Sequence, residues 1–392
     1  MVNLLPAVLV GGPPHAGKSV LFYRLTQALR ENGIAHHAIR ACPDGEGNWF
    51  HEGDPTMVST IRTKLTGEWP PEFVLRMRQD LEHRCLPFLV DMGGRPRGSQ
   101  IDLLHVCTHS ILLVKADEPD GTALWENLIA QCNLLPLARL FSLSEGNSIV
   151  TSQSPLLEGT LTGLHRHMPS TDTGPLFPLL GHLVATLFNS YALHDKKKAY
   201  LEQAPTEIVI DLEEALRTFT TTSTRWEPTM LQPFLESLPM QVPLSIYGIG
   251  PSWLYAVLSV YQGAYPFYLF DPKLPFGWIQ PAHIALGTEK SAEIHIETHV
   301  DEERTVLSIT FPYDRLEYFQ LYPIIVPPVS TEKGLIIDGR IPNWLLTALM
   351  RLYKEAGVPW IAPFYVQSNR AIIAYSRVEP YQIGDSISKS AL

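Results

Sequence analysis

One short segment near the amino terminus restricts the fold more than any other. Residues 12–19 satisfy the G-x-x-x-x-G-K-S pattern of a phosphate-binding loop. That pattern needs a strand before it and a helix after it, and the chain supplies both. Ala7–Val10 is a short apolar run, and a helix is expected over Lys18–Glu31, ending near Asn32 and Gly33. The motif therefore predicts a nucleotide-binding α/β domain.

The chemistry of this loop follows from its residue types. Backbone N–H groups and the helix amino terminus can surround a β-phosphate. We expect Lys18 to reach the β- and γ-phosphates and Ser19 to hold Mg²⁺, with ATP as the nucleotide. Val114-Lys115-Ala116-Asp117 matches a GTP-reading segment only in part. The predicted cofactor-binding residues are Gly12, Pro13, Pro14, His15, Ala16, Gly17, Lys18, Ser19 and Val20.

Three acidic residues are candidates for the chemistry of phosphate transfer. Asp91 ends the apolar run Leu86–Asp91 and begins a D-x-x-G sequence, a place suited to a magnesium ligand. Asp44 and Glu46 follow the second expected strand, where a carboxylate can orient an acceptor hydroxyl. The alternative for Asp44 and Glu46 is an ordinary turn. Lys18, Asp44, Glu46 and Asp91 are the predicted catalytic residues of this domain, and Ser19 and Asp91 its metal ligands.

The first 203 residues alternate between strand and helix patterns. Further strands are expected at Ile34–Arg40 and Ile111–Lys115, and helices at Pro71–Arg84 and Leu176–Tyr191. This alternation predicts a doubly wound parallel sheet with helices on both faces. The Ser-, Thr-, Gly- and Pro-rich stretch from 142 to 175 is expected to be a hairpin or loop.

Composition excludes some partners. The formal net charge is −10, which argues against a DNA duplex or an anionic membrane as partner, because both require a basic face. The uncharged stretches 174–194 and 239–270 contain Pro and Gly residues that interrupt them, so no membrane span is expected. The four cysteines lack metal-site or redox spacing, and we interpret them as reduced thiols of a cytoplasmic protein.

The second half contains an internal repeat. Gly248-Ile249-Gly250-Pro251-Ser252-Trp253-Leu254 matches Gly339-Arg340-Ile341-Pro342-Asn343-Trp344-Leu345 in a shared G-x-x-P-x-W-L pattern. Each copy follows an apolar strand, precedes a helical run and then reaches a Pro-aromatic strand. The pattern predicts two tandem small α/β repeats, over 204–289 and 290–392. We expect them to pack against each other within one chain, related by a pseudo-twofold axis.

The repeats also carry a resemblance. Thr331-Glu332-Lys333-Gly334 followed by Gly339-Arg340-Ile341-Pro342-Asn343-Trp344-Leu345 resembles the signature of a CRISPR-associated ring nuclease family. That family is manganese-dependent and cleaves cyclic tetra-adenylate. Tyr381–Asp385 resembles its closing segment, and Asp271-Pro272-Lys273-Leu274 its Asp-Pro turn. Some family members are fused to a P-loop ATPase domain.

The resemblance implies an enzyme of cyclic oligoadenylate turnover that uses ATP, Mg²⁺ and, in the repeated half, Mn²⁺, and that forms a homo-oligomer. The family histidine two residues after the Trp is replaced by Tyr255 and Leu346. The expected ring-nucleotide contacts are Trp253, Asp271, Lys273, His283, Arg340, Asn343 and Trp344, with Asp271 and Arg340 also catalytic. For the two Trp rings alone, core packing is the competing interpretation.

Three functions stay open from sequence. In the first, the P-loop domain phosphorylates the adenylate ligand or its linear product. In the second, the repeats are a non-cleaving sensor and ATP binding controls assembly. In the third, the chain is an unrelated P-loop phosphotransferase.

Overall fold

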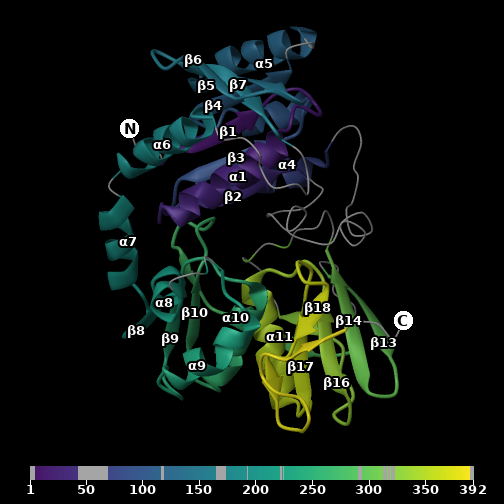
Figure 1. The fold of residues 1–392 in the computed structure, drawn as a ribbon. Coiled ribbons are helices and arrows are strands. Elements are labelled where there is room, and N and C mark those ends of the chain that lie inside the picture. The colour runs from purple at the N-terminus through teal and green to yellow at the C-terminus, as the bar shows by residue number, and fades with distance from the viewer. Residues whose placement is uncertain are drawn as a thin grey trace. The chain divides into compact units, whose positions relative to one another are not determined.

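A computed structural model describes residues 5–42, 69–115, 119–164, 174–191, 193–220, 223, 225–289, 294–311, 316, 318 and 323–388. The described residues pack into two compact units (Figure 1). The first contains the residues up to Ala199 together with Pro272–Pro275. The second contains Tyr200–Asp271 and the residues from Phe276 onward, so it includes both expected repeats. The further division of the second half at residue 289 stays a prediction.

A seven-stranded sheet forms the first unit, in the order β2-β3-β1-β4-β5-β7-β6. Every neighbouring pair is parallel except β6 and β7, which form an antiparallel edge. The strands are β1 (Ala7–Gly11), β2 (His37–Ala41), β3 (Phe88–Met92), β4 (His109–Lys115), β5 (Leu135–Leu143), β6 (Ile149–Ser152) and β7 (Leu157–Thr162).

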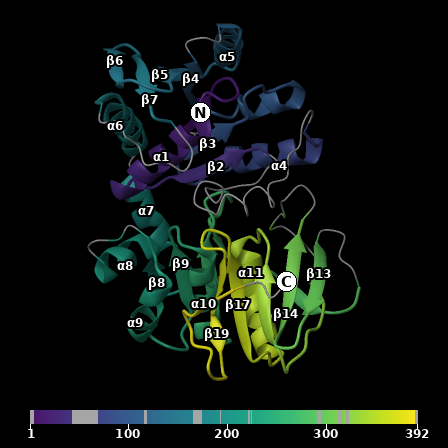
Figure 2. The ribbon, with the colours of Figure 1, turned by 45° about the vertical axis from the view of Figure 1, so that its right-hand side comes forward.

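Helices cover both faces of this sheet (Figure 2). Successive side chains of a strand point to opposite faces, so β1 contributes to two cores. Val8 and Val10 pack with α1 (Lys18–Glu31) and α6 (Leu176–Asn189). Ala7 and Leu9 pack with α4 (Pro71–Glu82) and α5 (Pro119–Gln131). The predicted doubly wound α/β fold is confirmed. The 3₁₀ helix η1 (Gly98–Leu103) completes the unit, and helix α7 (Leu193–Glu202) begins in it and ends in the second unit.

The stretch from 142 to 175 departs in part from its expectation. It does contain a hairpin, β6-β7, but β7 also pairs in parallel with β5 and so extends the central sheet. Leu157 and Leu161 of β7 are buried in the core beneath α6. The polar composition hid this strand because only alternate residues face that core.

The second unit contains two larger sheets and a small one. The first sheet has the order β11-β10-β9-β8, and the second β13-β14-β16-β17-β18-β20 with β19 beside β17, while β12 pairs with β15. The strands are β8 (Ile208–Asp211), β9 (Leu244–Tyr247), β10 (Phe267–Phe270), β11 (Trp278–Ile279), β12 (Ile284–Leu286), β13 (His295–Val300), β14 (Arg304–Thr310), β15 (Ile324–Val326), β16 (Gly334–Asp338), β17 (Trp360–Tyr365), β18 (Arg370–Ile372), β19 (Tyr375–Ser376) and β20 (Ser386–Ile387). Its helices are α8 (Leu212–Phe219), η2 (Pro228–Met230), α9 (Leu231–Glu236), α10 (Ser252–Tyr261) and α11 (Asn343–Glu355).

The sequence repeat is also a repeat of structure. The parallel pair β9 and β10 is joined through α10, and the parallel pair β16 and β17 through α11. The first glycine of each motif has a positive φ, 95° at Gly248 and 136° at Gly339. Each helix then begins after a proline in extended backbone, Pro251 and Pro342. The shared glycine and proline therefore build the same strand-to-helix turn twice.

The two repeat helices contact each other at their carboxyl ends. Lys354 Nζ of α11 donates to the Val260 carbonyl at 2.6 Å. Arg351 Nη2 donates to the carbonyls of Gly263 at 2.7 Å and Tyr265 at 2.8 Å. Cationic side chains satisfy helix carbonyls that have no partner within the helix, and they oppose the negative end of the helix dipole. The expected contact between the repeats is therefore present.

None of the helices in the described part of the chain is both long and apolar enough to cross a bilayer.

Candidate nucleotide site

Backbone geometry in the loop after β1 depends on its glycines. Gly12 has a φ of 143°, and a Cβ built on it would lie 1.9 Å from the Leu113 carbonyl oxygen. Gly17, with a φ of 92°, is the N-cap of α1. His15 also has a positive φ, 62°. At Gly12 and Gly17 the loop thus has a backbone conformation that residues with a side chain rarely adopt.

Lys18 lies at the first position of α1 and is 7% exposed. Its Nζ donates to the Pro13 carbonyl at 2.7 Å, so the ammonium group lies against the loop. A buried lysine needs acceptors for its charge, and in this structure the loop itself provides one. The side chain is therefore held beside the backbone that the motif assigns to phosphate binding.

Ser19 and Asp91 meet, as the sequence predicts for two ligands of one metal. Ser19 Oγ donates to Asp91 Oδ2 at 3.0 Å, and the Asp91 side chain is 2% exposed. The sheet order explains the meeting, because β1 and β3 are adjacent and Val10 lies opposite Asp91. The carboxyl ends of parallel strands lie at one edge of the sheet, where α/β proteins bind their ligands.

Arg40 joins the same pair and was not foreseen from the sequence. Its Nη1 lies 3.8 Å from Asp91 Oδ2, with 8% of the Arg40 side chain exposed. Arg40 is directly opposite Asp91 in the β2–β3 pairing. The buried carboxylate therefore has a hydroxyl and a guanidinium on the same oxygen, which supplies the charge compensation that a buried acid needs.

Trp125 of α5 fixes the loop that follows Asp91. Its Nε1 donates to the Gly94 carbonyl at 3.0 Å. A Cβ built on Gly94 would lie 2.5 Å from Pro14 N, and one built on Gly11 2.6 Å from the Trp125 ring. Both glycines are thus required for close packing of the D-x-x-G segment against the phosphate-binding loop. Nothing local in the sequence distinguishes Trp125 from an ordinary core tryptophan.

Some predicted residues of this domain receive no structural account. Asp44 and Glu46 lie outside the described residues, so their proximity to the loop is untested. Among the arginines of this domain, Arg78 pairs with Glu82 on the exposed face of α4, with Nε 2.8 Å from Oε1. That geometry is an ordinary surface ion pair.

In the second unit, the tryptophans of the two motifs are core residues. Trp253 is 0% exposed and Trp344 is 4% exposed. Their rings have no open face for stacking on a base, so the packing interpretation applies to both. The two residues at the position of the family histidine, Tyr255 and Leu346, are buried as well. Tyr255 Oη donates to the Gly248 carbonyl at 2.6 Å, and burial raises the pKa of its phenol.

The other expected ring-nucleotide contacts are distributed more widely. Arg340 is half-buried in the turn before α11, and Asn343 is the first residue of that helix. The Ala282 N–H donates to the Trp344 carbonyl at 2.9 Å, which brings the exposed His283 close to the start of α11. Asp271 is half-buried after β10, and Lys273 belongs to the short segment grouped with the first unit.

Metal ligation beyond Ser19 and Asp91 finds no support in the described residues. They contain no group of three or more His, Cys, Asp or Glu side chains that could hold an ion. His295 and Glu297 of β13 contact each other, Nε2 to Oε1, at 3.2 Å on an exposed strand. All four cysteines are free and buried.

Comparison with known proteins gives one family match. The family model described as CRISPR-associated protein (Cas_csx3) matches residues 310–388. No curated protein matches. Among solved structures, the kinase domain of Escherichia coli tyrosine kinase ETK is similar at 16% sequence identity and a TM-score of 0.25, over 35% of this chain and 66% of that chain. The carboxy-terminal part of the chain, which includes the second repeat motif, therefore matches a CRISPR-associated family.

Proposed function

We propose that this chain is a CRISPR-linked P-loop enzyme that uses ATP and Mg²⁺ and transfers the γ-phosphate to a cyclic oligoadenylate or its linear product. The observation that carries the proposal is the contact between Ser19 Oγ and Asp91 Oδ2 beside the Lys18 loop. A hydroxyl and a buried carboxylate at one sheet edge are the donor set that Mg²⁺ prefers in nucleotide sites.

Each residue has a defined part in this proposal. The loop N–H groups and the start of α1 bind the phosphates, and Lys18 leaves the Pro13 carbonyl for the phosphate oxygens. Ser19 and Asp91 would hold Mg²⁺, which supplies charge neutralisation at the β- and γ-phosphates. Trp125 and Gly94 keep the loop after Asp91 pressed against Pro14, so that the phosphate site is ordered before the ligand arrives.

The transfer step requires an acceptor hydroxyl. A ring-opened oligoadenylate with a free 5′-hydroxyl offers one: its oxygen forms a bond to the γ-phosphorus, the bond to the β-phosphate oxygen breaks, and ADP leaves. The hydroxyl proton passes to a carboxylate, for which Asp44 and Glu46 are the candidates. Phosphorylation would block re-closure of the ring and draw a reversible opening forward.

A second candidate function has its own observation. Both positions of the family histidine hold buried residues, Tyr255 at 5% and Leu346 at 3% exposure. A buried phenol whose pKa is raised by burial is poorly suited to proton transfer at neutral pH. This favours a repeated half that binds the cyclic oligoadenylate near Arg340 without cleaving it, with ATP binding controlling assembly.

One experiment separates these functions. The chain is incubated with γ-phosphate-labelled ATP, Mg²⁺ or Mn²⁺, and cyclic or linear tetra-adenylate, and the products are resolved by chromatography and mass. We expect label on linear adenylate. Lys18→Ala should lower turnover by about 100-fold or more, because the loop cation is lost from the transition state, whereas the matched change Lys196→Ala on α7 should have no effect. Label found only as free phosphate would disprove the transfer, and unchanged turnover in Lys18→Ala would disprove the site.

A further inference from the structure

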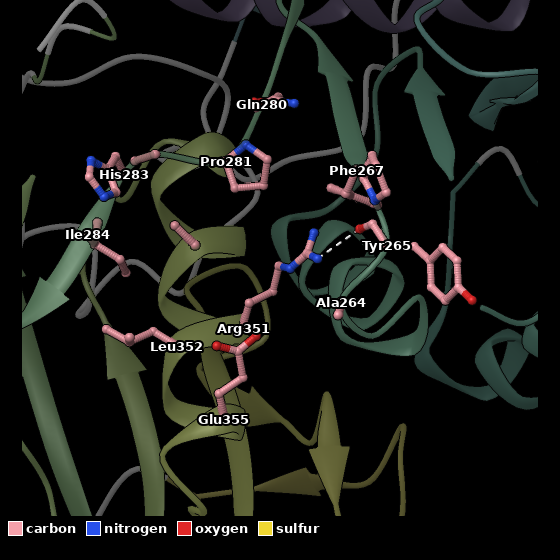
Figure 3. Close-up of a pocket in the computed structure, with 13 residues that line it drawn as sticks. Ala264, Tyr265, Phe267, Gln280, Pro281, His283, Ile284, Arg351, Leu352 and Glu355 are labelled. Atoms are coloured by element: carbon pink, nitrogen blue, oxygen red, sulfur yellow. Dashed lines mark hydrogen bonds between the residues drawn. The ribbon is translucent and has the colours of Figure 1, made fainter. Parts of the chain in front are cut away.

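A pocket of about 350 Å³ lies within the second unit, where α11 faces the first repeat. One wall is α11, and the other is formed by the turn after α10 and the segment that leads into β12 (Figure 3). The pocket is far along α11 from the Arg340 turn, because its lining residues Ala348, Arg351, Leu352 and Glu355 occupy the middle and end of that helix. Among the residues expected to contact the ring nucleotide, His283 also lines this pocket, whereas Arg340, Asn343 and Trp344 at the start of α11 do not.

Arg351 brings unused hydrogen-bond donors to this pocket. Its Nη2 donates to the carbonyls of Gly263 and Tyr265, which fixes the guanidinium in place. Figure 3 shows the bond to Tyr265. Within the described residues, Nε and Nη1 have no hydrogen-bond partner. Burial is the main cause that lowers the pKa of Arg351, so the group is partly removed from water. Two donors on an anchored, partly desolvated cation favour a ligand with an acceptor.

Glu355 brings the complementary acceptor. It lies four residues later on the same helix and lines the same pocket (Figure 3). Its carboxylate makes no ion pair with Arg351 or with any other described cation at 4.0 Å or less. The pocket thus presents a donor site and an acceptor site side by side, above an apolar floor that includes Phe267, Ala348 and Leu352.

These charges exclude several ligand classes. Glu355 repels an anion and Arg351 repels a cation, while a wholly apolar ligand leaves the Arg351 donors without partners. A zwitterion would match both charges but would have to lose its hydration over the apolar floor, so the pocket favours a neutral, flat molecule with an amino donor next to an acceptor atom. Adenine has this edge, because its exocyclic amine adjoins a ring nitrogen. A volume near 350 Å³ is at the small end of ligand pockets and is adequate for a purine nucleoside.

We propose that the pocket between α11 and the first repeat binds an adenine base, with Glu355 accepting from the amine and Arg351 donating to the adjacent ring nitrogen. The apolar floor packs on the face of the purine. The site belongs to the second unit and does not depend on the nucleotide chemistry proposed for the P-loop.

The test uses nucleosides, which lack the phosphates that the P-loop recognises. Calorimetry with the full chain should detect adenosine, and inosine should bind about 10-fold more weakly or worse, because a carbonyl replaces the amine and faces Glu355. Glu355→Gln should weaken adenosine and reduce its preference over inosine, since an amide can both donate and accept. Glu332→Gln, which removes an exposed charge elsewhere in the unit, should leave adenosine binding unchanged.

Further measurements separate this proposal from the one made for the P-loop. Adenosine binding should persist in Lys18→Ala, so a failed P-loop proposal leaves this one standing. Four results would each overturn the proposal. They are no binding of adenosine, equal binding of inosine, tighter binding of guanosine, and wild-type adenosine binding by a Glu355→Gln variant that its melting curve shows to be folded.

Discussion

Arg40→Gln is the substitution whose outcome follows most directly from the geometry. Arg40 Nη1 is 3.8 Å from the buried Asp91 Oδ2, and this contact supplies positive charge to a carboxylate that also accepts from Ser19. At an effective dielectric constant of about 20, two unit charges at this distance interact by roughly 4 kcal/mol. In the unfolded wild-type chain Arg40 is hydrated, and this hydration offsets part of the ion-pair energy. We therefore expect Arg40→Gln to lower the free energy of unfolding by about 3 kcal/mol.

The prediction has a second part, because Mg²⁺ is expected to bind the Asp91 carboxylate and to compensate its charge in place of Arg40. In the apo protein, Arg40→Gln should lower the melting temperature of the first unit by roughly 6–12 °C. With saturating Mg²⁺ and a non-hydrolysable ATP analogue, the difference from wild type should shrink to about a third or less, because the ion then compensates Asp91. Scanning calorimetry in both states measures this directly.

Its control is Arg78→Gln, which removes an arginine from an exposed ion pair and should leave both melting curves unchanged. An equal loss in the apo and the liganded state would mean that Arg40 is purely structural. No loss in the apo state would mean that the Arg40–Asp91 contact does not matter.

Two further predictions concern stability. His36 is buried, and burial, followed by the charge of Arg30, lowers its pKa to about 4 against the offsetting hydrogen bond to Ile34. Below pH 6.5 the unfolded chain takes up a proton that the folded chain refuses, so up to about 3 kcal/mol of stability should be lost between pH 6.5 and 4. Urea titrations across that range should show less acid sensitivity in His36→Phe, and identical profiles would refute the assignment. Gly334→Ala should destabilise the second unit by about 2 kcal/mol or more, because its Cβ would lie 1.8 Å from Trp360 Cε2. Gly181→Ala, in α6 with no atom within 4 Å of the new Cβ, should instead stabilise by up to about 1 kcal/mol; the reverse ranking of the two variants would contradict this packing argument.

Local features of the fold were predictable because they depend on neighbouring residues. The bounds of α1, the strand-turn-helix setting of the phosphate-binding loop, and the repeat all follow from apolar periodicity and from Gly and Pro placement. The meeting of Ser19 and Asp91 was expected from the motif, and the sheet places them together.

Long-range features were not predictable from one sequence. Arg40 lies beside Asp91 only because β2 is next to β3, and strand order is set by the packing of the whole sheet. Trp125 reaches Gly94 across 31 positions of the chain. The pocket joins Phe267 and Glu355, which no local pattern relates. The motif around Trp253 and Trp344 is compatible with an indole ring that binds a ligand and with one that packs in the core. Only the burial seen in the structure distinguishes the two roles.

Because the two repeats belong to one chain, they can carry different residues at equivalent positions. In a homodimer with an isologous interface, every site occurs twice, because each subunit presents the same residues. Here the motif tryptophans are 91 positions apart, from 253 to 344, so Arg351 corresponds to Val260 and Glu355 to Ala264. The helix that supplies the charged pair therefore has a partner that lacks it. A ligand held by that pair should saturate at one molecule per chain, and each repeat is able to change without a matching change in the other.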